Sequence, residues 1–308
     1  MNKSNQRTIY GQQLLLWGER MDNVVVLEAD LGKSTMTSAF QQAHPDRYFE
    51  MGIAEADMTG FAAGLALTGK IAFTNSFAVF AAGRAYDQIR QGVAIGMLNV
   101  KIVGSSAGLS DFGDGATHQA IEDMAIMRAI PNMTVLCPAD GPQVREMMDY
   151  IVHHDGPVYM RLCRNDLPEI TTPGTGIAPS VMREGTDVAL VACGVMVSKA
   201  LEAAELLQTS GVSARVINVP CLKPLDEKAI LRLTEGVRGV VTCEEHSVIG
   251  GLSQAVCWAL RGQGIPLDAV AVMDVFGQSA HSAEELYTAY HLQPEDIQLR
   301  ALALIQKA

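Results

Sequence analysis

The chain has 308 residues, of which 48% are hydrophobic and 19% charged, and it carries a formal net charge of -11 at pH 7. This length allows about two domains of ordinary size. The acidic balance argues against a nucleic acid or an anionic membrane surface as the main partner, so an anionic substrate needs a local basic pocket.

The cysteines and the N-terminal stretch indicate a cytoplasmic protein. The six cysteines fall singly, mostly in apolar strand-like runs, with no CxxC pair. This pattern is typical of buried, reduced thiols rather than of a disulfide framework or a zinc site. The stretch MNKSNQRTIYGQQ lacks the apolar core of a signal peptide, and no apolar run is long enough to cross a membrane.

Apolar, β-branched runs alternate with helical stretches along the chain, which indicates parallel sheets covered by helices on both faces. One stretch rich in Pro, Gly and Thr interrupts the pattern and is typical of a linker. The sequence therefore predicts an α/β fold of two doubly wound domains, 1–172 and a smaller 185–308, joined by a linker at 173–184. Strands are predicted at 23–31, 70–77, 99–106, 133–140 and 158–164, and then at 187–194, 214–222, 239–246 and 268–276; helices of the first domain are predicted at 56–69, 82–95 and 141–154.

Glu55 directly precedes a predicted helix that is rich in Ala and Gly and poor in charge. One interpretation is a plain helix-terminal acid, because the positive end of a helix favours a carboxylate. The other is functional: we expect this helix to pack deep, with Phe77 and Phe80 on the loop after the next strand as a flat apolar wall. A carboxylate beside aromatic rings suits binding and protonation of a heteroaromatic ring, although two Phe side chains alone fit an ordinary core.

The stretch DFGDGATHQ places Asp114 and His118 four residues apart before a predicted helix. Either Asp114 or Thr117 caps that helix and His118 lies on the surface, or the pair hydrogen-bonds substrate hydroxyls at a strand end. The GDG triplet is also found in the diphosphate and metal motif of thiamine enzymes. That motif needs an Asn about thirty residues downstream, where this chain has ADGPQVREMMDY, so we predict no metal site in this chain.

Several further polar residues are ambiguous in isolation. Arg161 and Arg164 lie three apart at a strand end and suit recognition of a carboxylate or phosphate, but a strand-end Arg is often a solvated cation. Arg7 and Ser34 carry no signal by themselves. The stretch CEEHSVIGGLSQAV fits a strand-to-helix turn with a packing role better than a site loop.

Together these motifs resemble the transketolase family, from about Arg7 to the C-terminus. The chain is similar to the pyrimidine-binding and C-terminal domains of transketolase, encoded as a separate subunit. The motifs that carry the resemblance stand in the order and spacing typical of the family: ADLGKS, RYFEMGIAEADM, TNSFAVF, DGATHQAIEDMAIMRAIPNMTVLCPAD, DGPVYMRLCRNDL and EEHSVIGGL.

The resemblance implies a role for each candidate residue. Glu55 matches the glutamate that hydrogen-bonds the aminopyrimidine ring of thiamine diphosphate and promotes the tautomer that deprotonates the thiazolium carbon. Phe77 and Phe80 match the aromatic pocket around that ring. The residues implied for substrate are Asp114 and His118, on sugar hydroxyls and with His118 also catalytic, and Arg7, Ser34 and Arg164, on a phosphate.

Two positions depart from the family pattern: a substrate histidine falls on Ser106, and a third aromatic of the pyrimidine pocket falls near Gly83. Arg161 and the stretch RAYDQ are also reminiscent of deoxyxylulose-phosphate synthase. The resemblance implies an N-terminal transketolase subunit as the partner in an α2β2 tetramer, holding most of the Mg2+ and diphosphate contacts. The β subunit of a 2-oxoacid dehydrogenase and a non-catalytic homologue stay open as alternatives.

Overall fold

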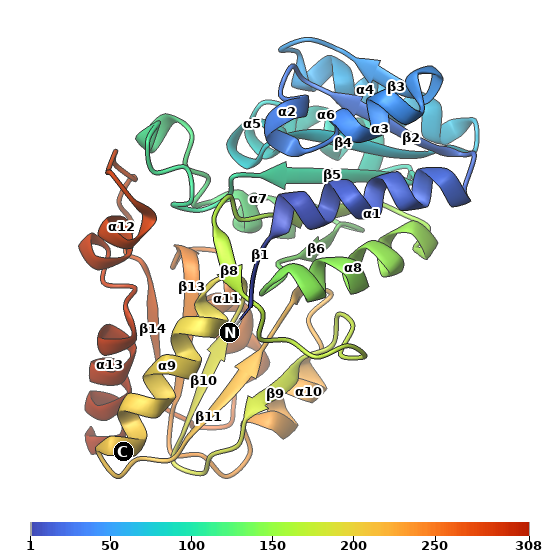
Figure 1. Cartoon of the computed structure of the whole chain (residues 1–308). Coiled ribbons are helices and arrows are strands. Elements are labelled where there is room, and N and C mark those ends of the chain that lie inside the picture. The colour runs from blue at the N-terminus through green and yellow to red at the C-terminus, as the bar shows by residue number, and fades with distance from the viewer. Residues whose placement is uncertain (1, 308) are drawn as a thin grey trace.

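The computed structural model describes residues 2–307, so the end residues of the predicted domains, 1 and 308, lie outside it. The chain forms a seven-stranded and a five-stranded sheet with helices packed on them, and a two-stranded ribbon (Figure 1). This confirms the predicted α/β class. None of the helices within 2–307 is long and apolar enough to span a membrane.

The seven-stranded sheet has the order β12-β6-β7-β5-β4-β2-β3. All neighbouring strands are parallel except β12, which pairs antiparallel with β6 at one edge. Its strands are β2 (Val24–Glu28), β3 (Tyr48–Glu50), β4 (Ile71–Phe77), β5 (Val100–Ser105), β6 (Thr134–Leu136), β7 (Val158–Arg161) and β12 (Cys221–Lys223).

The central strands are covered on both faces, so every residue of β2, β4 and β5 is buried. In β2, Val24 and Val26 pack into one core cluster with the helices α1 and α8, while Val25 and Leu27 pack into another on the opposite face. A strand with both faces covered has no polar side, as expected for a parallel sheet. The helices of this half are α1 (Gln6–Arg20), α2 (Gly32–Thr35), α3 (Ser38–Ala43), α4 (Glu55–Leu67), α5 (Ala78–Gly83), α6 (Tyr86–Gln88), α7 (Asp123–Ala129) and α8 (Gly141–His153).

The second sheet has the order β14-β13-β10-β11-β9, with β9 antiparallel to β11 and the other pairs parallel. Val188 and Leu190 of β10 face one core, and Ala189 and Val191 face the core cluster that continues into the first half. The two halves therefore share a hydrophobic core. The elements are β9 (Ser180–Arg183), β10 (Val188–Ala192), β11 (Ala214–Asn218), β13 (Val240–Ser247) and β14 (Leu267–Val272), with α9 (Met196–Thr209), α10 (Glu227–Leu233), α11 (Leu252–Ala259), α12 (Ala283–Ala289) and α13 (Pro294–Lys307).

Four short strands, β1 (Lys3–Asn5), β3, β8 (Asp166–Pro168) and β9, were not predicted from the sequence, and the predicted strand 214–222 is divided into β11 and β12. The ribbon pairs β1 with β8; β3, β9 and β12 are sheet edges. β9 lies inside the predicted linker 173–184, and β12, from the predicted second domain, joins the sheet of the first. The exact domain limits stay a prediction.

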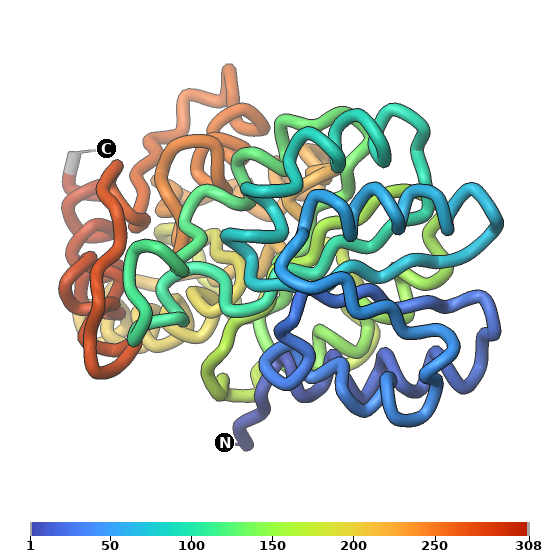
Figure 2. Tube along the Cα trace, turned by 90° about the horizontal axis from the view of Figure 1, so that it is seen from above, coloured from blue at the N-terminus to red at the C-terminus, as the bar shows by residue number. Residues whose placement is uncertain are grey.

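The loop 106–120 of the first half lies against the C-terminal half, as Figure 2 shows from above. The backbone N–H of Ala280 donates to the carbonyl of Phe112 at 2.9 Å, and the Gln119 amide donates to the carbonyl of Gln278 at 3.0 Å. This loop carries two of the predicted site residues, so the C-terminal half helps to position them.

Candidate active site

The predicted site residues gather at the carboxyl ends of the parallel strands of the first sheet. Phe77 ends β4, the loop carrying Asp114 and His118 follows β5, and Arg164 follows β7. In open α/β sheets, this edge is where ligands bind. The parallel topology therefore brings together residues that are far apart in sequence.

Glu55 is the first residue of α4, and its side chain is only 3% exposed. Arg84 donates from one guanidinium nitrogen to both carboxylate oxygens, at 3.1 and 3.3 Å. The Ser76 hydroxyl lies 3.5 Å from one of these oxygens. The carboxylate is thus buried, while the cation that pairs with it is half-exposed.

Aromatic rings lie beside this carboxylate. Phe77 and Phe80 are nearly parallel, with centroids 6.2 Å apart, and the His118 ring meets Phe80 edge-on at 5.2 Å. The guanidinium of Arg84 lies 4.1 Å from the centroid of the Phe80 ring. The structure thus brings Glu55, Phe77, Phe80 and His118 into one cluster, with a flat apolar surface beside an acid.

Two details of the sequence prediction were wrong. Phe77 is the last residue of β4 and Phe80 lies in α5, so neither lies on a loop. The helix α4 is not packed deep on all sides: Phe61 and Leu67 are 43% and 75% exposed. The low charge of α4 is therefore not a sign that the whole helix is buried.

The loop between β5 and α7 is arranged differently from the capping interpretation. α7 begins at Asp123, so neither Asp114 nor Thr117 caps it. Asp114 is exposed at the start of a single 3-10 turn. The Thr117 hydroxyl lies 2.9 Å from Nδ1 of His118, whose side chain is half-buried. Asp114 is thus exposed to solvent and His118 lies beside Phe80, so both are available to a ligand.

Arg7, Ser34 and Arg164 also come together. Arg7 donates to the carbonyl of Ser34 at 2.9 Å and to that of Arg164 at 3.2 Å. Arg164 in turn forms an ion pair of 2.6 Å with Asp111, which is 1% exposed. Burial, followed by the neighbouring Arg164, lowers the pKa of Arg7. The arrangement is a cationic group of two guanidiniums and one carboxylate.

Asp111 connects the two clusters. Burial raises the pKa of its carboxyl, Arg164 opposes this, and Asp114 adds to it. One oxygen of Asp111, Oδ2, is buried and has no hydrogen-bond partner among the described residues. Asp111 is therefore influenced electrostatically by Arg164 on one side and by Asp114 and His118 on the other.

Arg161 is a buried structural cation, not a solvated one. Its Nε lies 3.0 Å from the Asp123 carboxylate, and its other nitrogens donate to the carbonyls of Ala120 (3.1 Å) and Glu245 (3.2 Å). Burial acts to lower its pKa, but Asp123 together with Glu245 and other neighbouring acidic groups outweighs burial and raises the pKa above its ordinary value. Arg161 thus ties the site loop to the second sheet.

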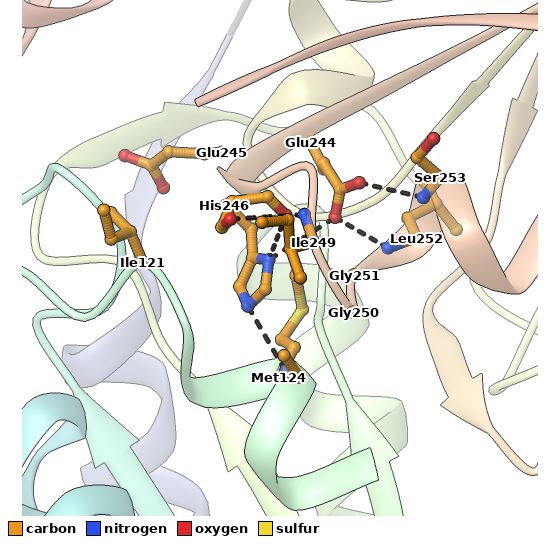
Figure 3. Close-up of polar contacts among 12 residues, drawn as sticks. Ile121, Met124, Glu244, Glu245, His246, Ile249, Gly250, Gly251, Leu252 and Ser253 are labelled. Carbon is orange, nitrogen blue, oxygen red and sulfur yellow. Dashed lines mark hydrogen bonds and ion pairs between the residues drawn. The ribbon is translucent and has the colours of Figure 1, made fainter. Parts of the chain in front are cut away.

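The CEEH stretch on β13 points its side chains in different directions (Figure 3). Glu244 accepts hydrogen bonds from the first backbone N–H groups of α11, at Leu252 (2.6 Å) and Ser253 (2.8 Å). This matches the packing role expected from the sequence, because a carboxylate is favoured at a helix N-terminus.

The next two residues of the stretch contact the first half. Nε2 of His246 accepts from the backbone N–H of Ala125 in α7 at 3.3 Å. Glu245 accepts from the backbone N–H of Leu109 at 2.9 Å and from the Tyr287 hydroxyl at 3.1 Å. The second half therefore holds the start of the site loop directly.

The two positions that depart from the family pattern have different surroundings. Ser106 is buried with φ +53°, and its hydroxyl has no hydrogen-bond partner among the described residues. Gly83 is exposed, and a Cβ there would meet nothing within 4 Å. A larger side chain therefore fits at 83. Within residues 2–307, no group of three or more His, Cys, Asp or Glu side chains could hold a metal ion.

Sequence reasoning missed Arg84, Asp111 and Glu245. Asp111 was visible as the first acid of SDFGDG, and Glu245 as part of the CEEH stretch. Arg84 follows the glycine at the family-divergent position 83, but no local pattern links it to Glu55. Only the fold reveals these partners.

The chain is similar to transketolases over almost its whole length. The model of the transketolase pyrimidine-binding domain matches residues 2–169, and that of the transketolase C-terminal domain matches residues 179–297. A putative transketolase C-terminal section of Methanocaldococcus jannaschii is 42% identical over 306 residues, which is 97% of this chain and 95% of the relative.

Two further comparisons agree. A 6-deoxy-6-sulfo-D-fructose transketolase subunit of Clostridium sp. (strain MSTE9) is 44% identical over 276 residues, 88% of this chain and 86% of the relative. A solved structure described as a split gene transketolase, inactive beta4 tetramer, is 42% identical and has a TM-score of 0.89 over 99% of each chain. By its two family models and by relatives that it covers almost completely, the chain belongs to the transketolase family, as a C-terminal subunit of the split type.

Proposed function

We propose that this chain is one half of a thiamine diphosphate-dependent transketolase that transfers a two-carbon ketol group between sugar phosphates. The observation that carries the proposal is the cluster of Glu55, Phe77, Phe80 and His118. It combines a buried carboxylate with a flat aromatic surface at the ligand-binding edge of the sheet.

The residues present fit the aminopyrimidine part of this cofactor. Phe77 and Phe80 offer a flat apolar surface, and Glu55 can hold or move a proton at a ring nitrogen. When bound, thiamine diphosphate supplies a nucleophilic carbon and an electron sink for breaking a carbon–carbon bond next to a carbonyl. His118 and Asp114 orient the sugar hydroxyls, which brings the ketose into a reactive position.

We propose that Arg7 and Arg164 bind the terminal anion of the substrate. Two guanidiniums facing one buried carboxylate, Asp111, leave a net positive charge in an otherwise acidic chain. A sulfonate carries the same kind of charge as a phosphate, and one relative is named for a sulfosugar. Substrates that differ only in this anion are therefore the first to compare.

We further propose that the chain acts with an N-terminal transketolase subunit in an α2β2 tetramer, in which the partner holds most of the diphosphate and Mg2+ contacts. Support comes from relatives named as a C-terminal section, a subunit and a split-gene protein. A cytoplasmic location is also proposed, supported by five buried free cysteines and one exposed one.

The test begins with purification of the tagged chain from its native host with any co-purifying subunit. Ketol transfer is then assayed with thiamine diphosphate and Mg2+, and pyruvate decarboxylation in parallel. Glu55→Gln should lower ketol transfer at least about 100-fold, because a Gln side chain cannot donate a proton to the cofactor ring or accept one from it as a carboxyl group does. Asp57→Asn is the matched control, since Asp57 is an exposed acid in the same first turn of α4.

The outcomes separate the alternatives. Equal losses in both variants would reduce Glu55 to a helix-terminal acid. Pyruvate decarboxylation without ketol transfer would favour a 2-oxoacid dehydrogenase-like or deoxyxylulose-phosphate synthase-like enzyme. A chain that isolates alone and binds no thiamine diphosphate would favour the non-catalytic homologue.

A further inference from the structure

Arg84 makes two contacts at once in the candidate site, and both are contacts that a flat cofactor ring would need. Its guanidinium donates to the Glu55 carboxylate, and it lies over the Phe80 ring. We propose that Arg84 is a placeholder: in the free subunit it occupies the place of the aminopyrimidine ring, and it must leave when that ring binds. This inference rests on the proposed function, in which the ring binds between these residues.

The first step of the argument concerns the charge of Glu55. Its side chain is 3% exposed, and among the described residues its carboxylate has only Arg84 and Ser76 as side-chain partners. A buried carboxylate without a counter-charge is costly. Arg84 supplies that counter-charge and so stabilises the free subunit.

The second step concerns shape. A guanidinium is planar and stacks on aromatic faces, and that of Arg84 lies 4.1 Å from the Phe80 centroid. The same Phe80 ring also lies beside Phe77, nearly parallel to it, and beside His118, which meets it edge-on. The face that Arg84 covers can accept one planar group at a time, so the arginine and a cofactor ring exclude each other there.

The third step concerns the freedom of Arg84 to leave. Its side chain is 50% exposed, and within residues 2–307 its guanidinium donates hydrogen bonds only to Glu55. It follows α5 directly, and the preceding Gly83 has open space around it. Rotation about the side-chain bonds alone can therefore move the guanidinium away from Glu55 and Phe80, without movement of the backbone.

A placeholder has a measurable cost. The apparent dissociation constant of the cofactor is the intrinsic constant divided by the fraction of time that Arg84 leaves the Phe80 face open. Arg84→Ala should therefore bind thiamine diphosphate about tenfold more tightly, since an ion pair and a cation–π contact of this exposure are no longer opposed to binding. Arg84→Lys keeps the charge without the planar group and should lie between Arg84→Ala and the unsubstituted protein.

The experiment has two readouts, and neither requires turnover. The first is the midpoint of thermal unfolding of the full chain alone, which Arg84→Ala should lower by about 2–4 °C, because Glu55 is left unpaired. The second is the dissociation constant of thiamine diphosphate, with Mg2+, for the two-subunit complex, measured by calorimetry. In a Glu55→Gln background, Arg84→Ala should change the unfolding midpoint little, because the carboxylate charge is gone.

The chain offers a matched control in Arg261. Its guanidinium lies 4.3 Å from the Trp258 centroid and pairs with Glu227 at 2.8 Å, and its side chain is 52% exposed. Arg261→Ala removes the same kinds of contact away from the site and should leave the cofactor dissociation constant unchanged.

The results separate the inference from the proposed function. Weaker cofactor binding in Arg84→Ala would make Arg84 a supporting residue of the bound state and overturn the placeholder, while the proposed function stands. Unchanged binding would overturn it as well. A complex in which the unsubstituted chain binds no thiamine diphosphate would overturn the proposed function and the inference with it. If Arg84→Ala does not fold, Arg84→Met, which keeps the apolar stem on Phe80, gives the same test.

Discussion

At the scale of single residues, burial decides how each charged side chain should be interpreted. Arg161 and Arg164 are three residues apart and look equivalent in the sequence. Arg161 is 5% exposed and paired with buried Asp123, whereas the Arg164 side chain is 41% exposed and lies at the rim of the site. One is therefore a structural ion and the other is available to a ligand.

Arg161→Met should strongly destabilise the protein. The substitution leaves the Asp123 carboxylate buried without its partner and removes hydrogen bonds to two backbone carbonyls. The expected loss is about 3–5 kcal/mol in the free energy of unfolding, measured by urea titration. Arg261→Ala, in an exposed ion pair, should cost at most about 1 kcal/mol. Similar losses in the two variants would contradict the structural role.

At the scale of elements, the central strands and the edge strand β14 could be predicted from the sequence, whereas the edge strands β3 and β9 could not. β2, β4, β5, β10 and β13 are buried along almost their whole length because both faces of each are covered, and each begins with an apolar residue. The apolar run 214–222 predicted one strand, but the chain forms two there, β11 and β12. β12 pairs with β6 of the first sheet. This pairing depends on tertiary packing, because the two strands are far apart in the sequence.

The strand β13 positions the site loop through Glu245. A side chain at Gly108, which has φ +65°, would collide with the Glu245 carboxylate, so the loop and the strand are closely packed. Glu245 also accepts the backbone N–H of Leu109 and the Tyr287 hydroxyl. The order of the loop therefore depends on a residue from the other half of the chain.

Glu245→Ala should loosen the loop that carries Asp114 and His118. With two hydrogen bonds lost, amide hydrogen exchange in residues 108–118 should become about 10- to 30-fold faster. Glu245→Gln keeps an acceptor oxygen and should restore most of the protection. Exchange that stays at the original rate in Glu245→Ala would show that the loop is held by other contacts.

At the scale of the whole molecule, buried acids make the free energy of unfolding depend on pH. Carboxyl groups usually stabilise a fold more as the pH rises, whereas these stabilise it less. Burial raises the pKa of Glu28, Glu244 and Glu245 to about 7 in each case. An acid with a raised pKa in the folded state stabilises most below its unfolded pKa of 4.5, and this stability is lost as the pH rises through 7.

His246 works in the opposite direction. Burial lowers its pKa to about 4, so its contribution is complete above pH 6.5 and is lost as the pH falls towards 4. Between about pH 4.5 and 6.5 the three acids lose more stability than the one histidine gains, so these groups together predict a maximum of the free energy of unfolding near pH 4.5. Urea titrations from pH 4 to 9 would measure it.

Glu28→Gln tests one part of this profile. Glu28 accepts hydrogen bonds from the hydroxyls of Thr35 and Thr37, both at 2.7 Å, and a Gln oxygen can accept them as well. The variant should lose less stability than the unsubstituted chain between pH 5 and 8, by about 1–3 kcal/mol. Identical slopes in the two proteins would contradict a titrating Glu28.

The sequence by itself determined the α/β class, the central strands, and the motifs that identify the family with its candidate residues Glu55, Phe77, Phe80 and His118. These follow from local periodicity and from residue order, which a linear pattern records. Only the tertiary structure decided that Arg84 covers Glu55, that Asp111 pairs with Arg164, and that Glu245 holds Leu109. These partners are 29, 53 and 136 residues apart, and such contacts depend on how strands and helices pack, which no local pattern contains.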